Sequence, residues 1–207
     1  MPGSSPGTGP RGGCCRCIRT RWRRTGAGWR RSWCHADRVA ANRDELGSLI
    51  ERVCAERELA YERTGAYAFA VTLPGTRKLR TVCNLVLGEH ALRVEAFVMR
   101  APDERHEQLW AWLLRRNARM YGVAFAIDGA GDVYLTGRVG LAAVTEDELD
   151  RLLGSVLTYA DESFDTMLEI GFASAIRREW AWRISRGEST ANLAAFRHLA
   201  EGSPEQS

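Results

Sequence analysis

The sequence of 207 residues predicts an α+β fold with one antiparallel sheet of about five strands, in the order α-β-β-β-α-β-β-α followed by extra C-terminal helices. Two observations predict it, and a third excludes a membrane span. The spacing of apolar residues changes from about 3.6 to 2 and back, as it does where helices alternate with strands. Short Gly-containing turns join the strand-like runs, which connects antiparallel neighbours, and helices then pack on one face. No uncharged run approaches the ~18 residues of a membrane span, which excludes a membrane-spanning protein.

The first helix is expected between Asn42 and about Ala60. Asn42 is a good N-cap, and Glu45 follows it at the capping-box spacing. Apolar residues then recur three or four positions apart, as on the buried face of an amphipathic helix. These residues are Leu46, Leu49, Ile50, Val53 and Leu59.

Three strands are expected next, as an antiparallel meander. The first alternates apolar with small or polar residues over Tyr67–Leu73 and ends at a Pro-Gly turn. The second and third cover residues 79–87 and 92–99. The dipeptide Gly88-Glu89 between them suits a two-residue hairpin with Gly at the first central position.

A second helix is expected from Asp103 to about Met120, followed by two more strands. The residues expected on its buried face are Leu109, Trp110, Leu113, Leu114 and Asn117. Alternating apolar residues over 121–127 and 133–135 predict the strands, on either side of a Gly-rich turn.

The remaining chain is predicted to be helical. Thr145 and Glu148 form a capping box, and an apolar stripe extends this helix to about Ile170, where Gly171 is expected to break or bend it. The stripe continues through Phe172, Ile176, Trp180 and Ile184. The helix is expected to end at Gly187, and Ser189 is expected to cap a short last helix.

Charge divides the chain into two parts. Residues 1–36 contain eight Arg and no Asp or Glu, which leaves −5 for residues 37–207 out of a total of +3. The first segment has no apolar periodicity, so we expect a disordered tail rich in Arg, Gly, Cys and Trp. We expect residues 37–200 to form the folded domain and residues 201–207 to be a disordered C-terminus.

The tail leaves several interpretations open. Cys14, Cys17, Cys34 and His35 have spacings from which a zinc site can be drawn, but such ligands need folded support, so no metal is predicted. Interleaved Arg and Trp could instead hold nucleic acid, which is the alternative function. The composition also fits GC-rich coding bias or an over-long start. No segment has the apolar stretch of a secretory signal, so a cytoplasmic protein is expected.

Candidate catalytic residues are few. His106 begins a zinc-protease pattern, but the second ligand would have to stand at Trp110. Cys54 and Cys83 lie in apolar surroundings where a buried, inert thiol is usual. No phosphate-binding loop exists, and Lys78 is the only Lys. The sequence predicts no enzyme, no catalytic residue and no cofactor; a small enzyme would need Cys83 or His106 in a cleft.

Two Trp-Ala-Trp stretches suggest a binding surface. Residues two positions apart point about 200° apart around a helix, so both indoles cannot lie on one narrow buried stripe. One interpretation is that each outer Trp is covered within its own domain. The other is a partner surface, because Trp and Arg are enriched at interfaces. The candidate contacts are the strand face and a partner surface that consists of Trp112, Arg116, Arg119, Arg178 and Trp182.

Several short motifs carry a family resemblance. They are Thr72–Gly75 with Arg77–Arg80, Val94–Phe97, Arg100–Glu104, Leu113–Ala118 running into Tyr121–Phe125, Gly131–Leu135, Ala160–Phe164 and Ile176–Arg183. On these motifs, residues 44–199 resemble the YbjN-domain family of bacterial sensory transduction regulators, whose fold is similar to type III secretion chaperones. The resemblance implies the same element order and no known reaction. It also implies a regulatory or chaperone-like homodimer that binds another polypeptide, away from any membrane.

Overall fold

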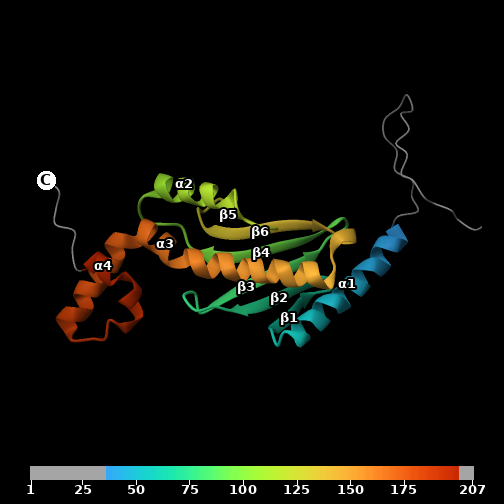
Figure 1. The fold of residues 1–207 in the computed structure, drawn as a ribbon, viewed down its shortest axis with the longest axis horizontal. Coiled ribbons are helices and arrows are strands. Elements are labelled where there is room, and N and C mark those ends of the chain that lie inside the picture. The colour runs from blue at the N-terminus through green and yellow to red at the C-terminus, as the bar shows by residue number, and fades with distance from the viewer. Residues whose placement is uncertain (1–35, 201–207) are drawn as a thin grey trace, which may run out of the picture. The chain divides into compact units, whose positions relative to one another are not determined.

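The computed structural model describes residues 36–200, with side chains described from residue 43 onward (Figure 1). The residues from which a zinc site could be drawn, the possible nucleic-acid tail and the expected disordered termini lie outside these residues. The described elements are α1 (Ala36–Glu56), β1 (Ala60–Gly65), β2 (Ala68–Pro74), β3 (Arg80–Leu87), β4 (Ala91–Met99), α2 (His106–Asn117), β5 (Ala124–Ile127), β6 (Val133–Gly140), a short 3-10 helix η1 (Leu141–Ala143), α3 (Glu146–Arg186), a second 3-10 helix η2 (Ala191–Phe196) and α4 (Arg197–Ala200).

The predicted α+β class with one antiparallel sheet is confirmed, but the sheet has six strands in the order β1-β2-β3-β4-β6-β5. The extra strand is β1, which begins at Ala60, where the predicted first helix was expected to end. All six residues of β1 are exposed at the sheet edge, so the sequence there lacks the alternation that predicts a strand.

The helix α1 begins at Ala36, so the N-cap predicted at Asn42 is wrong. The Ala-rich residues before Asn42 favour helix and carry it past that capping pattern.

One face of the sheet is buried under helices. In Figure 1, α1 and α3 lie across this face. Burial alternates along β3 and β4, and the buried set includes Cys83, Leu85, Leu92, Val94 and Ala96. The tight β3–β4 turn closes with the Gly88 amide donating to the Ala91 carbonyl at 2.9 Å. Its central residues are therefore Glu89 and His90, one position beyond the Gly88-Glu89 pair predicted.

The helix α2 lies beside β5 and α3 and buries a narrower stripe than expected. Leu109 and Leu113 are buried, but Leu114 is 70% exposed, so its place on the buried face is wrong. A helix of 12 residues at the sheet edge covers only a small area, which leaves Leu114 outside it. The Asn117 side chain bonds both the amide and the carbonyl of Phe125, at 2.8 and 3.0 Å, and ties α2 to β5.

The long helix α3 begins and bends where predicted. Its N-cap Thr145 accepts a hydrogen bond from the Glu148 amide at 3.2 Å. Phe172, next to Gly171, has non-helical angles (φ −141°, ψ 16°), which confirms the bend. Gly187 ends the helix with φ 68°, and η2 and α4 then pack back against α3. Among the described residues, no helix is both long and apolar enough to cross a membrane.

Candidate partner-binding surface and adjoining pocket

The loop between β2 and β3 (residues 75–79) is fixed to α3 by one carboxylate. The amides of Thr76, Arg77 and Lys78 donate to Oδ1 of Asp161 at 2.9, 2.8 and 2.9 Å. The Thr76 hydroxyl donates to Oδ2 at 2.6 Å. Two of the motifs that carry the family resemblance therefore meet here, although they lie about 85 residues apart.

The same contacts predict how stability depends on pH. Desolvation raises the pKa of Asp161, but the hydrogen bonds from Thr76, Lys78 and Arg77 outweigh it, so this pKa lies below its usual 3.8. A carboxyl with a lowered folded pKa stabilises the fold above its unfolded value, and that contribution is lost as pH falls through the folded value. We expect Asp161→Asn to lower the unfolding free energy by about 1 kcal/mol at pH 7 and by less at pH 3, measured by urea denaturation.

The matched control is Asp150→Asn, which removes a carboxylate from the same helix. Asp150 pairs at 2.8 Å with Arg57 on the surface, where both side chains are well exposed. Exposed pairs contribute little, so we expect a change of only a few tenths of a kcal/mol. An Asp161→Asn deficit that is equally large at pH 3 and pH 7 would contradict the assignment.

A second anchored loop follows β4. Arg100 holds Asp103 through two hydrogen bonds of 2.7 and 3.0 Å, and its guanidinium stacks 4.4 Å from the ring centroid of Phe172. Glu104 accepts bonds from the amide and hydroxyl of Ser174 at 2.6 and 3.1 Å. The loop is thereby fixed to the bend of α3.

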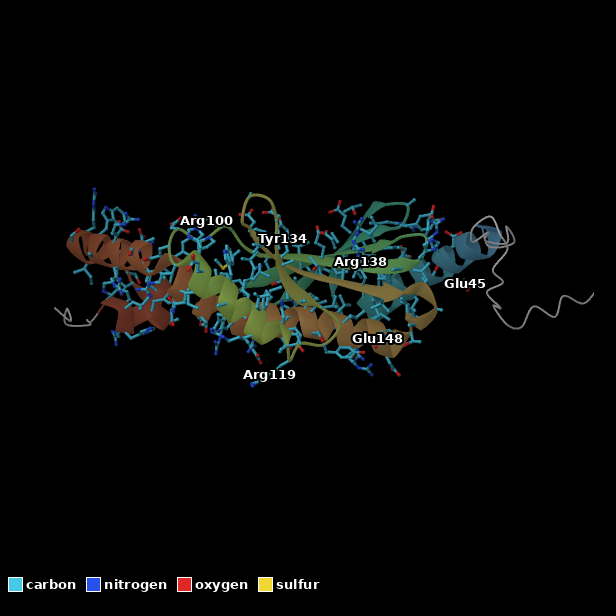
Figure 2. The ribbon with its side chains drawn as sticks, turned by 90° about the horizontal axis from the view of Figure 1, so that it is seen from above. Glu45, Arg100, Arg119, Tyr134, Arg138 and Glu148 are labelled. Carbon is cyan, nitrogen blue, oxygen red and sulfur yellow. The ribbon has the colours of Figure 1, made fainter. Side chains whose placement is uncertain are left out.

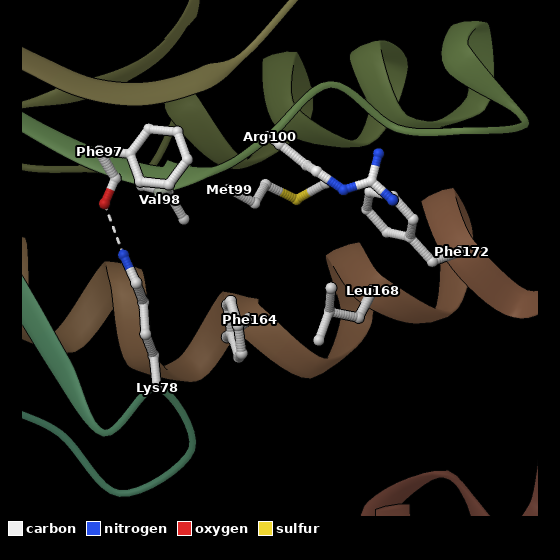
Figure 3. Close-up of a pocket in the computed structure, with 8 residues that line it drawn as sticks. All are labelled: Lys78, Phe97, Val98, Met99, Arg100, Phe164, Leu168 and Phe172. Atoms are coloured by element: carbon white, nitrogen blue, oxygen red, sulfur yellow. Dashed lines mark hydrogen bonds between the residues drawn. The ribbon is translucent and has the colours of Figure 1, made fainter. Parts of the chain in front are cut away.

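An apolar cavity of about 390 Å³ lies between the two anchored loops (Figure 3). Lys78 stands at one end, and Arg100 on Phe172 stands at the other. The walls between them come from β4 and from α3, and they are formed by Phe97, Met99, Phe164 and Leu168.

The Lys78 ammonium has no acidic partner among the residues that the structure describes. Its Nζ donates to the backbone carbonyl of Phe97 and lies 5.6 Å from the centroid of the Phe97 ring. Desolvation lowers the pKa of Lys78 to about 8. The cation is therefore half-buried without a compensating negative charge.

The face of the sheet opposite α1 and α3, called the open face below, carries an apolar row. Phe97 stands opposite Tyr134 on β6, and their rings meet edge to face with centroids 5.4 Å apart. Val82 precedes Cys83, the partner of Ala96, so it lies beside Phe97. Val82 and Phe97 are 42% and 43% exposed. The row thus crosses β3, β4 and β6 without a cover among the described elements.

The open face also carries a pair of opposed basic residues. Arg93 on β4 lies directly opposite Arg138 on β6, and both are exposed. Within the described part of the chain, neither makes a salt bridge. With Glu95 and Thr136 they border a hollow of about 340 Å³. In Figure 2, Tyr134 and Arg138 lie on the side of the sheet away from α3.

The surface residues predicted from the sequence lie in separate places. Arg116 donates from Nε to Ser163 at 3.0 Å and pairs with Glu162 at 2.8 Å, and its guanidinium lies 5.7 Å from the ring of half-buried Trp112. These contacts favour the interpretation that Trp112 is covered within its own domain. Arg119 is exposed at the end of α2.

The other two predicted residues lie further along α3. Trp182 is 45% exposed, with the guanidinium of Arg186 at 5.4 Å from its ring. Roughly 28 Å of helix, at 1.5 Å per residue, separates Trp182 from Ser163, the residue that Arg116 contacts. Arg178 is exposed between them. The structure therefore groups Trp112 with Arg116 and leaves Trp182 apart; partner binding by all five stays a prediction.

The sequence interpretation named the strand face as a candidate contact but assigned no residue to it, although a signal for such residues exists. Val82 and Phe97 stand at the outward positions of strands whose alternate residues, such as Cys83 and Ala96, are buried. Large apolar residues at outward positions of an antiparallel strand are the exception. That mismatch would have identified the apolar row.

The predicted inert thiols are confirmed as buried and free. Burial, followed by the neighbouring Cys54, raises the pKa of Cys83 to about 12. Burial and the charge of Glu51 raise the pKa of Cys54 as well. Within residues 36–200, no group of three or more His, Cys, Asp or Glu side chains could hold a metal ion.

Residues 47–169 match the sequence profile of YbjN, described as "Putative bacterial sensory transduction regulator". The chain belongs to the YbjN family. This YbjN protein is 56% identical over 132 residues to "Uncharacterized protein Rv0487" of Mycobacterium tuberculosis, which covers 64% of this chain and 72% of the relative. It is 48% identical over 159 residues to "Uncharacterized protein ML2442" of Mycobacterium leprae, covering 74% and 86%. The resemblance seen in the sequence is confirmed.

Solved structures similar to this YbjN protein include type III secretion chaperones. The ExsC–ExsE complex matches with a TM-score of 0.43 and 19% identity, covering 58% of this chain and 91% of the other. The Yersinia pestis chaperone SycH, solved with a fragment of YscM2, matches with a TM-score of 0.41 and 20% identity, covering 55% and 95%. The family match ends just before the bend of α3, so the C-terminal part of α3, η2 and α4 lie beyond it.

Proposed function

We propose that this YbjN protein is a non-enzymatic regulatory module that binds another polypeptide on the open face of its sheet. The observation that carries the proposal is the apolar row of Val82, Phe97 and Tyr134 on an uncovered face. The exposed face of an antiparallel sheet is normally polar, and contiguous exposed apolar patches mark interaction sites. The family description as a regulator agrees with such a role.

The charges of the open face indicate what kind of partner it binds. Like charges directly opposite each other on neighbouring strands are destabilising, so Arg93 and Arg138 favour a partner that supplies a carboxylate between them. Arg93 lies four residues before Phe97 on β4, which is about 13 Å along a strand. The partner segment that fits is therefore extended, with an apolar and an acidic side chain at about this separation.

Burial of Cys54 and Cys83, the two thiols that the structure describes, supports a non-enzymatic protein, and free thiols are typical of the cytoplasm, the compartment we propose. A homodimer is proposed from the family resemblance, and light scattering tests it. We expect a mass twice the 23.1 kDa of one chain, and a single-chain mass would contradict the dimer.

A pair of charge substitutions tests the open face. Val82→Asp places a carboxylate in the apolar row without touching the cavity, whereas Leu114→Asp places one at an exposed Leu on α2. We expect Val82→Asp to reduce capture of polypeptide from lysate about tenfold, which corresponds to roughly 1.4 kcal/mol of binding free energy. Leu114→Asp should capture as much as the wild type. Equal capture by both variants, each checked for folding by circular dichroism, would contradict the proposal.

A further inference from the structure

We propose that the cavity between the β2–β3 loop and the bend of α3 binds a small amphiphilic carboxylate. Its carboxylate would lie at Lys78, and its apolar tail would run along α3 toward Phe172. This ligand site goes beyond the proposed partner binding. It adjoins the open face, because Phe97 belongs both to the apolar row and to the cavity wall.

The size and walls of the cavity suit an apolar body. Its volume of about 390 Å³ lies within the range of small-molecule sites, roughly 300 to 1,000 Å³. Phe164 and Leu168 of α3 face Met99 of β4 across it, so the space between the two ends offers almost no hydrogen-bonding partner. An alkyl or aromatic group would displace poorly held water there.

The proposed carboxylate site uses the hydrogen-bond donors of the Lys78 ammonium that its contact with Phe97 leaves available. An ammonium has three donors, and this one makes a single hydrogen bond, to the Phe97 carbonyl. The charged groups on the elements packed against it are already engaged: Asp161 accepts the loop amides, Asp165 lies 3.7 Å from Arg77, and Arg100 holds Asp103. Glu95 lies on the open face, two residues before Phe97.

The ligand should carry one negative charge, at the Lys78 end. The charge of Arg100 is already compensated by Asp103, to which it makes two hydrogen bonds, and its guanidinium stacks on Phe172, so we assign Arg100 to the wall and the anion to Lys78. The loop that bears Lys78 is held in place by Asp161 before any ligand arrives. Such preorganisation lowers the entropy lost on binding.

Titration calorimetry with decanoate and 1-decanol on the full chain tests the assignment, because the two probes share an alkyl chain and differ in charge. We expect wild type to bind decanoate about tenfold or more tightly than decanol at pH 7. In Lys78→Met, which removes the ammonium and keeps most of the side-chain length, the two affinities should become about equal. Arg80→Met removes an exposed cation two residues away and should keep the tenfold preference.

The pH dependence gives a second readout. Lys78 loses its charge as pH rises through about 8, so decanoate binding should weaken about tenfold by pH 9 while decanol binding stays constant. No saturable binding of decanoate, equal binding of acid and alcohol by wild type, or a preference retained in Lys78→Met would each overturn the assignment. Val82→Asp should bind decanoate like wild type, so this site and the partner surface can fail independently.

Discussion

Replacing Gly75 by Ala is expected to lower the free energy of unfolding by about 2 to 3 kcal/mol. A Cβ at this position would lie 2.6 Å from Oδ1 of Asp161 and closer still to the carbonyl oxygen of Lys78. Neither atom can easily move, because Asp161 Oδ1 already accepts three loop amides, including that of Lys78. The clash would therefore push the loop away from α3. Urea denaturation measures the loss.

The control is Gly129→Ala in the turn between β5 and β6. A Cβ at Gly129 would meet no atom within 4 Å. We expect its unfolding free energy to stay within about 0.5 kcal/mol of wild type. If Gly75→Ala were as stable as Gly129→Ala, the β2–β3 loop would not be fixed as described, and the position of Lys78 would lose its support.

Gly171→Ala and Gly154→Ala are expected to change stability in opposite directions, although both lie in α3. A Cβ at Gly171 would lie 2.7 Å from Cβ of Pro102, in the loop that follows β4. The Gly171 carbonyl also accepts the amide of Asp103 at 3.0 Å, so the two segments cannot separate freely. We expect a loss of about 2 kcal/mol. Gly154 has open space around it, so Ala there should stabilise the helix by about 0.5 to 1 kcal/mol.

Thermal unfolding compares the two variants with wild type. For a domain of this size, 1 kcal/mol corresponds to about 2 to 4 °C in Tm. Gly171→Ala should therefore unfold several degrees below wild type and Gly154→Ala a few degrees above it. A rise in Tm for Gly171→Ala would show that the contact with Pro102 does not constrain the bend of α3.

Periodicity and caps predicted most of the fold because most elements bury exactly one side. The alternation in β2, β3 and β4, the cap at Thr145 and the stop at Gly187 are local signals, and the structure confirms them. β1 has no buried side and so no alternation. Its pairing with β2 depends on backbone hydrogen bonds, which any sequence without Pro can make.

The site depends on contacts that no local pattern contains. The motifs around Lys78 and Asp161 are visible in the sequence, but their meeting across about 85 residues follows from the tertiary fold. The surroundings of Trp112 show the same limit of local patterns. A helical wheel places Trp112 away from one buried stripe, yet it does not show that Arg116, bound to Glu162 and Ser163, lies against its ring.

Site-specific photo-crosslinking tests the central claim, that the open face binds a polypeptide, most directly. A photoreactive phenylalanine analogue at Tyr134 lies in the apolar row, and the same analogue at Leu114 lies at an exposed position on α2. In cells that make the full chain, the first should yield a discrete crosslinked polypeptide that disappears in the Val82→Asp background, and the second should yield none. No adduct from position 134, or the same adducts from both positions, would contradict the claim.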